Sequence, residues 1–242
     1  MGLDLTLIPK DEYLIARLDE TSFHGEIKKT IRKAIQDAAT YYRTISPQTL
    51  EYLVALGRLS SRTEEDTYFI NLFYHLYGPN SQLPDLQPLL AKYKFIIDDE
   101  ALMFESKVGS YSTIHYLRSF CDKVFEYLKK GIPANTEETV REILEECAKN
   151  GCDYSYEHCP ALCYHSDCEG YYLPTTEPFD FEHSSSYKLA IELVRLYSSG
   201  AIDILNNKFR DKASVGNILW SFKILMYYAL SSLEHDEILE FC

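Results

Sequence analysis

The feature that most constrains this chain is the helical spacing of its apolar residues. Apolar side chains three or four positions apart lie on one face of an α-helix. This spacing is clearest over the ranges 25–43, 109–130, 185–198 and 213–233. Further helix starts are predicted from capping patterns: Ser46 before Pro47, a capping box at Ser61–Glu64, and Asn135 with Glu138. The chain is therefore predicted to be mainly helical.

Strand signals are few. Leucine alternates with small or polar residues from Leu3, and this strand runs to Ile8, where Pro9 ends it. Residues 95–104 have the pattern of a strand or hairpin. No repeat and no linker divides the chain. We predict an α+β, mainly helical fold, in a single domain (1–242) with a small sheet around the N-terminal strand.

Residues 151–184 differ in kind from the rest of the chain. They are rich in Tyr, Cys, His, Pro and acidic residues, and their apolar residues show no sustained helical or strand periodicity. A loop of this length inside a compact domain is uncommon unless it has a function. We therefore predict that 151–184 is a long functional loop.

The charge balance restricts the partners. The chain has 37 acidic and 24 basic residues, a net charge of −13. Such a chain repels phosphates on average, so we expect no nucleic-acid partner. Mimicry of DNA by the acidic surface is an alternative. We interpret the acidic residues as scattered among basic ones. This favours a role of the charge in solubility over mimicry of DNA. No apolar run is long enough for a membrane span, so no membrane partner is expected.

The seven cysteines bear on compartment and metal binding. Their odd number and the absence of a signal sequence predict reduced thiols in a cytoplasmic protein. Five of them fall between 147 and 168, and zinc is bound by such thiolates and imidazoles. The spacings are not those of a repeated zinc knuckle, so we expect no cofactor. Zinc is kept as an alternative, with the candidate ligands Cys152, His158, Cys159, Cys163 and His165.

Two further motifs could carry chemistry. In the run from His165 to Gly170, the carboxylates of Asp167 and Glu169 could face a metal or an amine, and Cys168 beside His165 could act as a nucleophile. The run Gly109–Ser112 precedes a predicted helix. Its hydroxyls and N–H groups could bind an anion, together with His115 and Arg118 on the same helix face. Each motif is also explained by ordinary capping or turn formation.

Taken in order, three motifs resemble a loose family of uncharacterised bacterial and phage proteins. These are Met1-Gly2-Leu3-Asp4-Leu5, Gly109-Ser110-Tyr111-Ser112 and His165-Ser166-Asp167-Cys168-Glu169-Gly170. Members open with Met-Gly-Leu-Asp and carry Gly-Ser-Tyr-Ser and Ser-Asp-Cys-Asp/Glu-Gly motifs. This chain differs in its extra cysteines and its longer tyrosine-rich loop. The resemblance implies a bacterial or viral origin and a shared site, but no reaction.

If the motifs recur together, they are expected to meet in one polar cleft. Its residues would be Asp4, Ser110, Tyr111, Ser112, His115, Arg118, His165, Asp167 and Glu169. Such a cleft suits a small nucleotide-like or zwitterionic ligand. We therefore predict a cytosolic binding protein for a small-molecule ligand or a host protein, and the resemblance implies that it can be phage- or prophage-encoded. The alternative is a metal-dependent hydrolase or nuclease that uses His165, Asp167 and Glu169. The sequence leaves the oligomeric state open.

Overall fold

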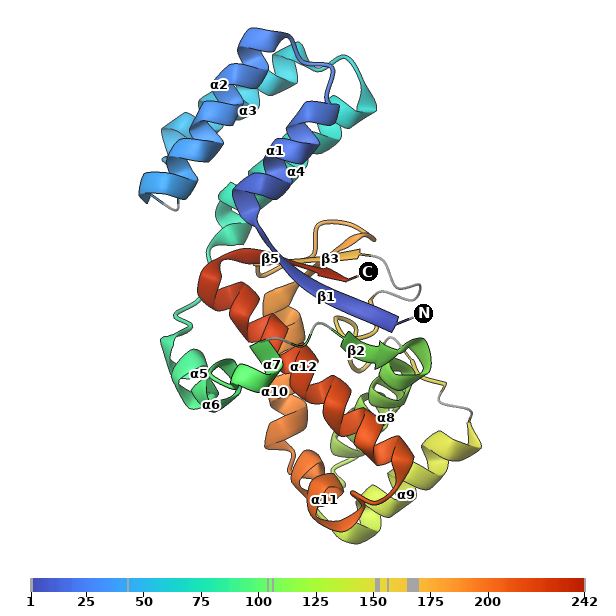
Figure 1. Cartoon of the computed structure of the whole chain (residues 1–242). Helices are drawn as coiled ribbons and strands as arrows, with labels where there is room; N and C mark the ends of the chain where they lie inside the picture. The colour runs from blue at the N-terminus through green and yellow to red at the C-terminus, as the bar shows by residue number, and fades with distance from the viewer. Residues whose placement is uncertain are drawn as a thin grey trace.

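The computed structural model describes residues 2–42, 44–103, 105, 107–150, 153–155, 157–164 and 170–241. The molecule is elongated, with a group of four helices at one end, a small sheet in the middle and a larger helical part at the other end (Figure 1). The prediction of a mainly helical α+β fold, with a small sheet that includes the N-terminal strand, is confirmed.

The four helices that follow the first strand form what we call the four-helix end (residues 10–77). They are α1 (Lys10–Glu20), α2 (Gly25–Asp37), α3 (Pro47–Ser60) and α4 (Glu64–Tyr77). The predicted helix at 25–43 is α-helical to Asp37 and continues as a π-helical turn, Ala38–Tyr42. Ser46 caps α3 as predicted, because its side chain accepts the N–H of Thr49.

One predicted cap is displaced by two residues. The capping box at α4 is formed by Thr63 and Asp66, and not by Ser61 and Glu64. Ser61 cannot cap α4 because it lies at the end of α3, where its hydroxyl donates to the carbonyl of Gly57 at 2.9 Å.

A five-stranded sheet with the order β2-β1-β5-β3-β4 crosses the middle of the molecule. Its strands are β1 (Gly2–Pro9), β2 (Lys107–Ser110), β3 (Gly170–Leu173), β4 (His183–Ser185) and β5 (Glu237–Phe241). Neighbouring strands are antiparallel except β3 and β4, which are parallel. The predicted strand at 3–8 is therefore confirmed as β1.

The sheet joins two hydrophobic cores because its side chains alternate between its faces. Leu5, Leu239 and Phe241 are buried in the core of the larger part. Leu173 and Ile238 are buried in the core of the four-helix end. The strands thus form a layer between the two helical parts (Figure 1).

The larger part is built around the long helix α12 (Ala213–His235), which packs on α8 (Tyr111–Lys129) and α10 (Ser186–Ser198). Its remaining helices are α5 (Gln87–Lys92), α6 (Lys94–Ile97), α7 (Glu100–Met103), α9 (Glu137–Lys149) and α11 (Ala201–Lys208); a 3₁₀ turn, Pro79–Ser81, follows α4. Among the described residues, no helix is both long enough and apolar enough to span a bilayer.

Two predictions in this part were wrong. Residues 95–104 are not a strand or hairpin but contain the short helices α6 and α7, whose Ile96 and Leu102 are buried in the core. Helix α9 is capped not by Asn135 but by Thr136, whose hydroxyl accepts the N–H of Thr139 at 3.2 Å. Within the predicted loop 151–184, the structure contains strands β3 and β4.

Candidate functional site

The first candidate site is the predicted polar cleft, and the sheet brings two of its segments together. In the β1–β2 pair, Gly2 lies opposite Ser110 and Asp4 lies opposite Lys107. Helix α8 begins at the next residue, Tyr111, and continues through Ser112. The N-terminal strand is thus adjacent to the Gly-Ser-Tyr-Ser segment.

The third segment of that cleft lies outside the described residues, since they do not include His165, Asp167 or Glu169. The convergence of all three motifs therefore stays a prediction.

Two members of the proposed cleft, on α8, contact the loop that follows α9. Arg118 is only 1% exposed, and its Nε donates to the carbonyl of Leu162 at 2.8 Å. Its Nη1 donates to the hydroxyl of Tyr154 at 3.2 Å. The His115 ring lies 5.3 Å from the Tyr154 ring, and burial, with the nearby Arg118, lowers the pKa of His115. Both side chains thus help to order residues 153–164.

A buried carboxylate and a half-buried one hold the same loop. Asp122 of α8 accepts the N–H of Ser155 at 3.1 Å and bonds Nδ1 of His158 at 2.9 Å. Glu192 of α10 accepts the N–H groups of Ala161 and Leu162 at 2.9 and 2.8 Å. Burial raises the pKa of Glu192 to about 7. Because buried polar groups require partners, these contacts help to fix the path of the loop, whose Cys159, Leu162 and Cys163 are also buried in the hydrophobic core.

The thiols near this loop are buried and protonated. Sγ of Cys159 lies 3.5 Å from Sγ of Cys163. A hydrogen bond with Cys121 raises the pKa of the Cys159 thiol, and a hydrogen bond with Cys159, together with burial, raises that of Cys163. Zinc binds the thiolate form of cysteine, and a raised pKa disfavours that form.

The candidate zinc ligands do not all lie among the described residues. Among the described residues, no three His, Cys, Asp or Glu side chains gather as metal ligands would. Cys152 and His165 lie outside that part of the chain, and the imidazole of His158 bonds Asp122. The zinc alternative thus stays a prediction.

A buried polar network ties residues 177–183 to the four-helix end. Tyr13 of α1 donates its hydroxyl to Nε2 of His183 at 2.5 Å. Nδ1 of His183 donates to Asp180 at 2.8 Å, and Tyr68 of α4 donates to the same carboxylate at 2.8 Å. Burial raises the pKa of Asp180, but the hydrogen bonds from His183 and Tyr68 outweigh it, so the pKa is lowered. Asp180 is therefore ionised, and both of its carboxylate oxygens accept hydrogen bonds.

The segment held by these contacts carries most of the negative charge of the protein. Residues 137–182, which we call the acidic segment, contain twelve acidic and two basic residues, a net charge of −10 out of −13. The four-helix end contains ten acidic and nine basic residues. Residues 78–136 contain seven acidic and seven basic residues. The interpretation of the acids as scattered among bases was therefore wrong, because it rested on the average over the whole chain.

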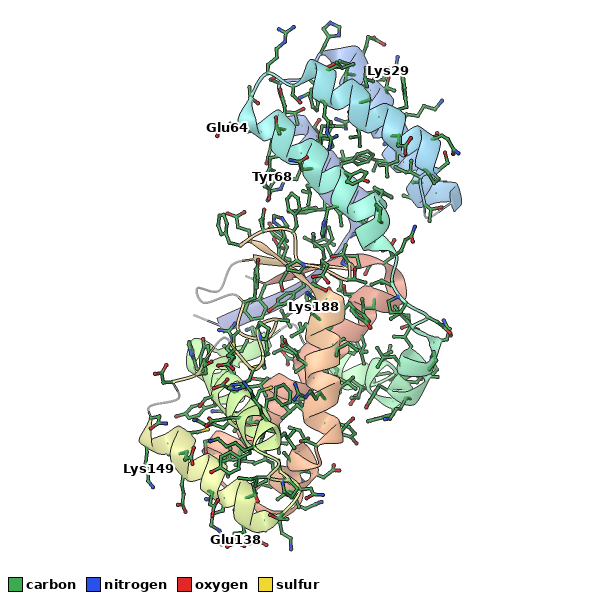
Figure 2. All side chains as sticks on the ribbon, turned by 180° about the vertical axis from the view of Figure 1, so that it is seen from behind. Lys29, Glu64, Tyr68, Glu138, Lys149 and Lys188 are labelled. Carbon is green, nitrogen blue, oxygen red and sulfur yellow. The ribbon has the colours of Figure 1, made fainter. Side chains whose placement is uncertain are left out.

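Helix α9 forms the first part of the acidic segment and lies at the end of the molecule farthest from the four-helix end (Figures 1 and 2). Glu138, Glu142 and Glu145 are exposed at positions i, i+4 and i+7, so they share one helix face. Successive carboxylates in this row are separated by about 4.5 to 6 Å along the helix axis. Within the described part of the chain, no cation lies within ion-pair distance of the three.

The comparisons with known proteins agree with this charge distribution. Residues 1–241 match the model of a family described as "Putative DNA-mimic protein". The match covers nearly the whole chain, so the protein belongs to this family. No curated protein and no solved structure is significantly similar to it.

Family membership corrects the predicted function and partner. The predictions of a small nucleotide-like or zwitterionic ligand, and of a metal-dependent hydrolase or nuclease using His165, Asp167 and Glu169, were wrong, because a DNA mimic binds DNA-binding proteins. The sequence contained the missing signal. A count of charge by segment, instead of over the whole chain, separates residues 137–182 from the rest.

Proposed function

We propose that this protein binds a DNA-binding protein in place of DNA, and that the carboxylates of the acidic segment take the positions of phosphates. The observation that carries the proposal is the concentration of a net charge of −10 in residues 137–182 of a chain that belongs to a DNA-mimic family.

The chemistry of DNA-binding surfaces supports this assignment. Such surfaces place Lys and Arg against phosphates, and these contacts do not depend on base sequence. Each DNA strand presents one charge about every 3.4 Å along its axis. A row of carboxylates such as Glu138, Glu142 and Glu145 offers a comparable, though sparser, line of negative charge.

The anchoring of the acidic segment supports a preformed binding surface. Arg118, Asp122 and Glu192 hold its middle part, and Asp180 holds its last turn. A segment that is already ordered loses less conformational entropy on binding than a flexible acidic tail would. The acids of its described residues are thus presented in fixed positions, as phosphates are on a duplex.

We place this interaction in the cytoplasm. DNA-binding targets occur there, and the buried cysteines Cys121, Cys159 and Cys163 are free thiols. The resemblance to bacterial and phage proteins directs the search for a target to bacterial DNA-binding proteins.

The test is competition with DNA. Immobilised protein is incubated with bacterial lysate, and the retained proteins are eluted with duplex DNA and identified by mass spectrometry. We expect DNA-binding proteins that duplex DNA displaces, and we expect their retention to weaken as salt rises, since charged contacts carry it.

A charge-matched pair of variants locates the surface. The triple variant Glu138→Gln, Glu142→Gln, Glu145→Gln is expected to lose most of the retained protein. The control Glu12→Gln, Glu26→Gln, Glu51→Gln removes the same charge from exposed positions of the four-helix end. The proposal is wrong if duplex DNA displaces nothing, or if the control weakens retention as much as the first triple variant.

A further inference from the structure

An aromatic groove lies on the larger part of the molecule, outside the acidic segment. It has a volume of about 450 Å³ and runs between α6, α11 and α12. Phe95 and Trp220 border it and are 60% and 40% exposed. Large aromatic side chains exposed together on a soluble protein mark an interaction surface. The groove is therefore a candidate for contact with another protein.

The charges in the aromatic groove are balanced, unlike those of the acidic segment. Asp99 and Asp203 line it together with Arg210 and Lys223. Among the described residues, none of these four side chains forms an ion pair within the protein. A surface that carries both signs in equal number is complementary to itself, because a two-fold axis can place the cations of one copy against the anions of the other.

The position of the groove also favours a second copy of the chain. Helices α6 and α9 lie on opposite sides of α12, as both views show (Figures 1 and 2). No residue of α9 lines the groove, so two copies can meet there without burying the α9 carboxylates in the groove. A strongly acidic chain repels itself least across a neutral face.

One glycine leaves room for a close approach. Gly216 of α12 lines the groove, and a Cβ at this position would meet nothing within 4 Å. Glycine inside a helix is less stable than alanine by about 1 kcal/mol.

We propose that the aromatic groove is the interface of a symmetric dimer of this chain. The dimer presents two acidic segments on its outside. The proposal rests on the chemistry of the groove and does not depend on binding to a DNA-binding protein, so the two proposals can fail separately.

Sedimentation velocity of the purified protein, from about 1 to about 100 μM, tests the proposal. We expect the sedimentation coefficient to rise from that of a monomer to that of a dimer. Trp220 is the single tryptophan, so its fluorescence reports on the groove alone. Its emission is expected to shift to shorter wavelength over the same concentration range. A monomer at every concentration would overturn the proposal, as would an emission shift caused by a bound small molecule without a change in mass.

Complementary charge variants provide the sharper test. An acidic-groove variant carries Arg210→Glu and Lys223→Glu, and a basic-groove variant carries Asp99→Lys and Asp203→Lys. Each variant alone is expected to remain monomeric. An equimolar mixture of the two variants is expected to associate as a heterodimer. Circular dichroism establishes that both are folded. The control Leu59→Asp, at a position 89% exposed on α3, is expected to dimerise as the wild type does. Association of either groove variant alone, or no association in the mixture, contradicts the proposed interface.

Discussion

The four-helix end and the acidic segment use charge in opposite ways. The four-helix end contains nearly equal numbers of acids and bases, and its order comes from an apolar core that includes Ile31, Phe69 and Phe73. The acidic segment contains six acids for every base. After α9, polar side chains from α8 and α10 hold its path together with buried apolar residues such as Leu162. Charge in the first region keeps the surface soluble. The second region carries an excess of negative charge, although Glu137, Glu157 and Glu177 each form an ion pair.

The largest expected effect comes from removing an anchor of the acidic segment. Arg118→Ala leaves the buried carbonyl of Leu162 without this donor and removes a large buried side chain. We expect a loss of about 3 kcal/mol in the free energy of unfolding, measured in denaturant. Hydrogen exchange is expected to accelerate in residues 153–164 before it does in α1–α4.

The control is Arg58→Ala on α3, where the arginine is exposed; its effect is expected to stay within about 0.5 kcal/mol. Equal losses for the two arginines would mean that Arg118 is not an anchor.

The next effect is a pH dependence at the junction of the two regions. Burial lowers the pKa of His183 and of His75 from the ordinary value of 6.5. The unfolded chain therefore binds these protons near pH 6.5, whereas the folded chain stays neutral. Stability is fully present above pH 6.5 and is expected to fall as the pH drops below it.

Thermal unfolding between about pH 5 and pH 7.5 measures this dependence. His183→Gln is expected to make the profile shallower. His75 and His115, whose pKa values are also lowered, contribute to the remaining slope, and Glu192, whose pKa is raised to about 7, opposes it. The control His235→Gln, at an exposed position, is expected to keep the wild-type slope. An unchanged slope in His183→Gln would show that the buried imidazole is not responsible.

A smaller effect is confined to the four-helix end. Thr63→Ala removes the cap of α4 and is expected to lower the free energy of unfolding by about 1 kcal/mol. Binding to proteins retained by the acidic segment is expected to be unchanged at a temperature where the variant is folded. Thr30→Ala, at an exposed position within α2, is the matched control and is expected to change stability little. Weaker binding in Thr63→Ala would show that the two regions are coupled.

The smallest expected effect tests repulsion on α9. Glu142 lies four residues after Glu138 and three before Glu145, and like charges at these spacings destabilise a helix by a few tenths of a kcal/mol for each pair. Glu142→Gln is thus expected to be slightly more stable than the wild type at low salt, and equal to it at high salt. Glu51→Gln on α3 is expected to show no such salt-dependent gain. A loss of stability in Glu142→Gln at low salt would contradict the idea of uncompensated charge.

The sequence predicted the elements that are specified by residues close together in the chain. Helical spacing identified α2 and α12, and Ser46 identified the start of α3, because these signals lie within a few residues of one another. Strand β5 was missed because its pairing with β1 joins the two ends of the chain. Residues 95–104 were misassigned, since a short apolar run does not distinguish a buried helical turn from a strand.

The candidate site was harder to predict than the fold. Arg118 was recognised as a functional candidate, but its contact with Leu162 depends on the folding of a loop some forty positions away. Asp122 and Glu192 were missed, because a buried carboxylate on a helix has no distinctive sequence pattern. The charge of residues 137–182 was readable from the sequence and was hidden only by averaging over the chain.

Carboxyl footprinting tests the central claim most directly. The protein is labelled with a carbodiimide, alone and in complex with a retained DNA-binding protein, and the modification of each carboxylate is measured by mass spectrometry. The account predicts protection of Glu138, Glu142 and Glu145 in the complex, with no change at Glu12, Glu26 and Glu51 of the four-helix end. Protection of the four-helix carboxylates, with the α9 row still fully modified, would contradict the assignment of the acidic segment as the surface that replaces DNA.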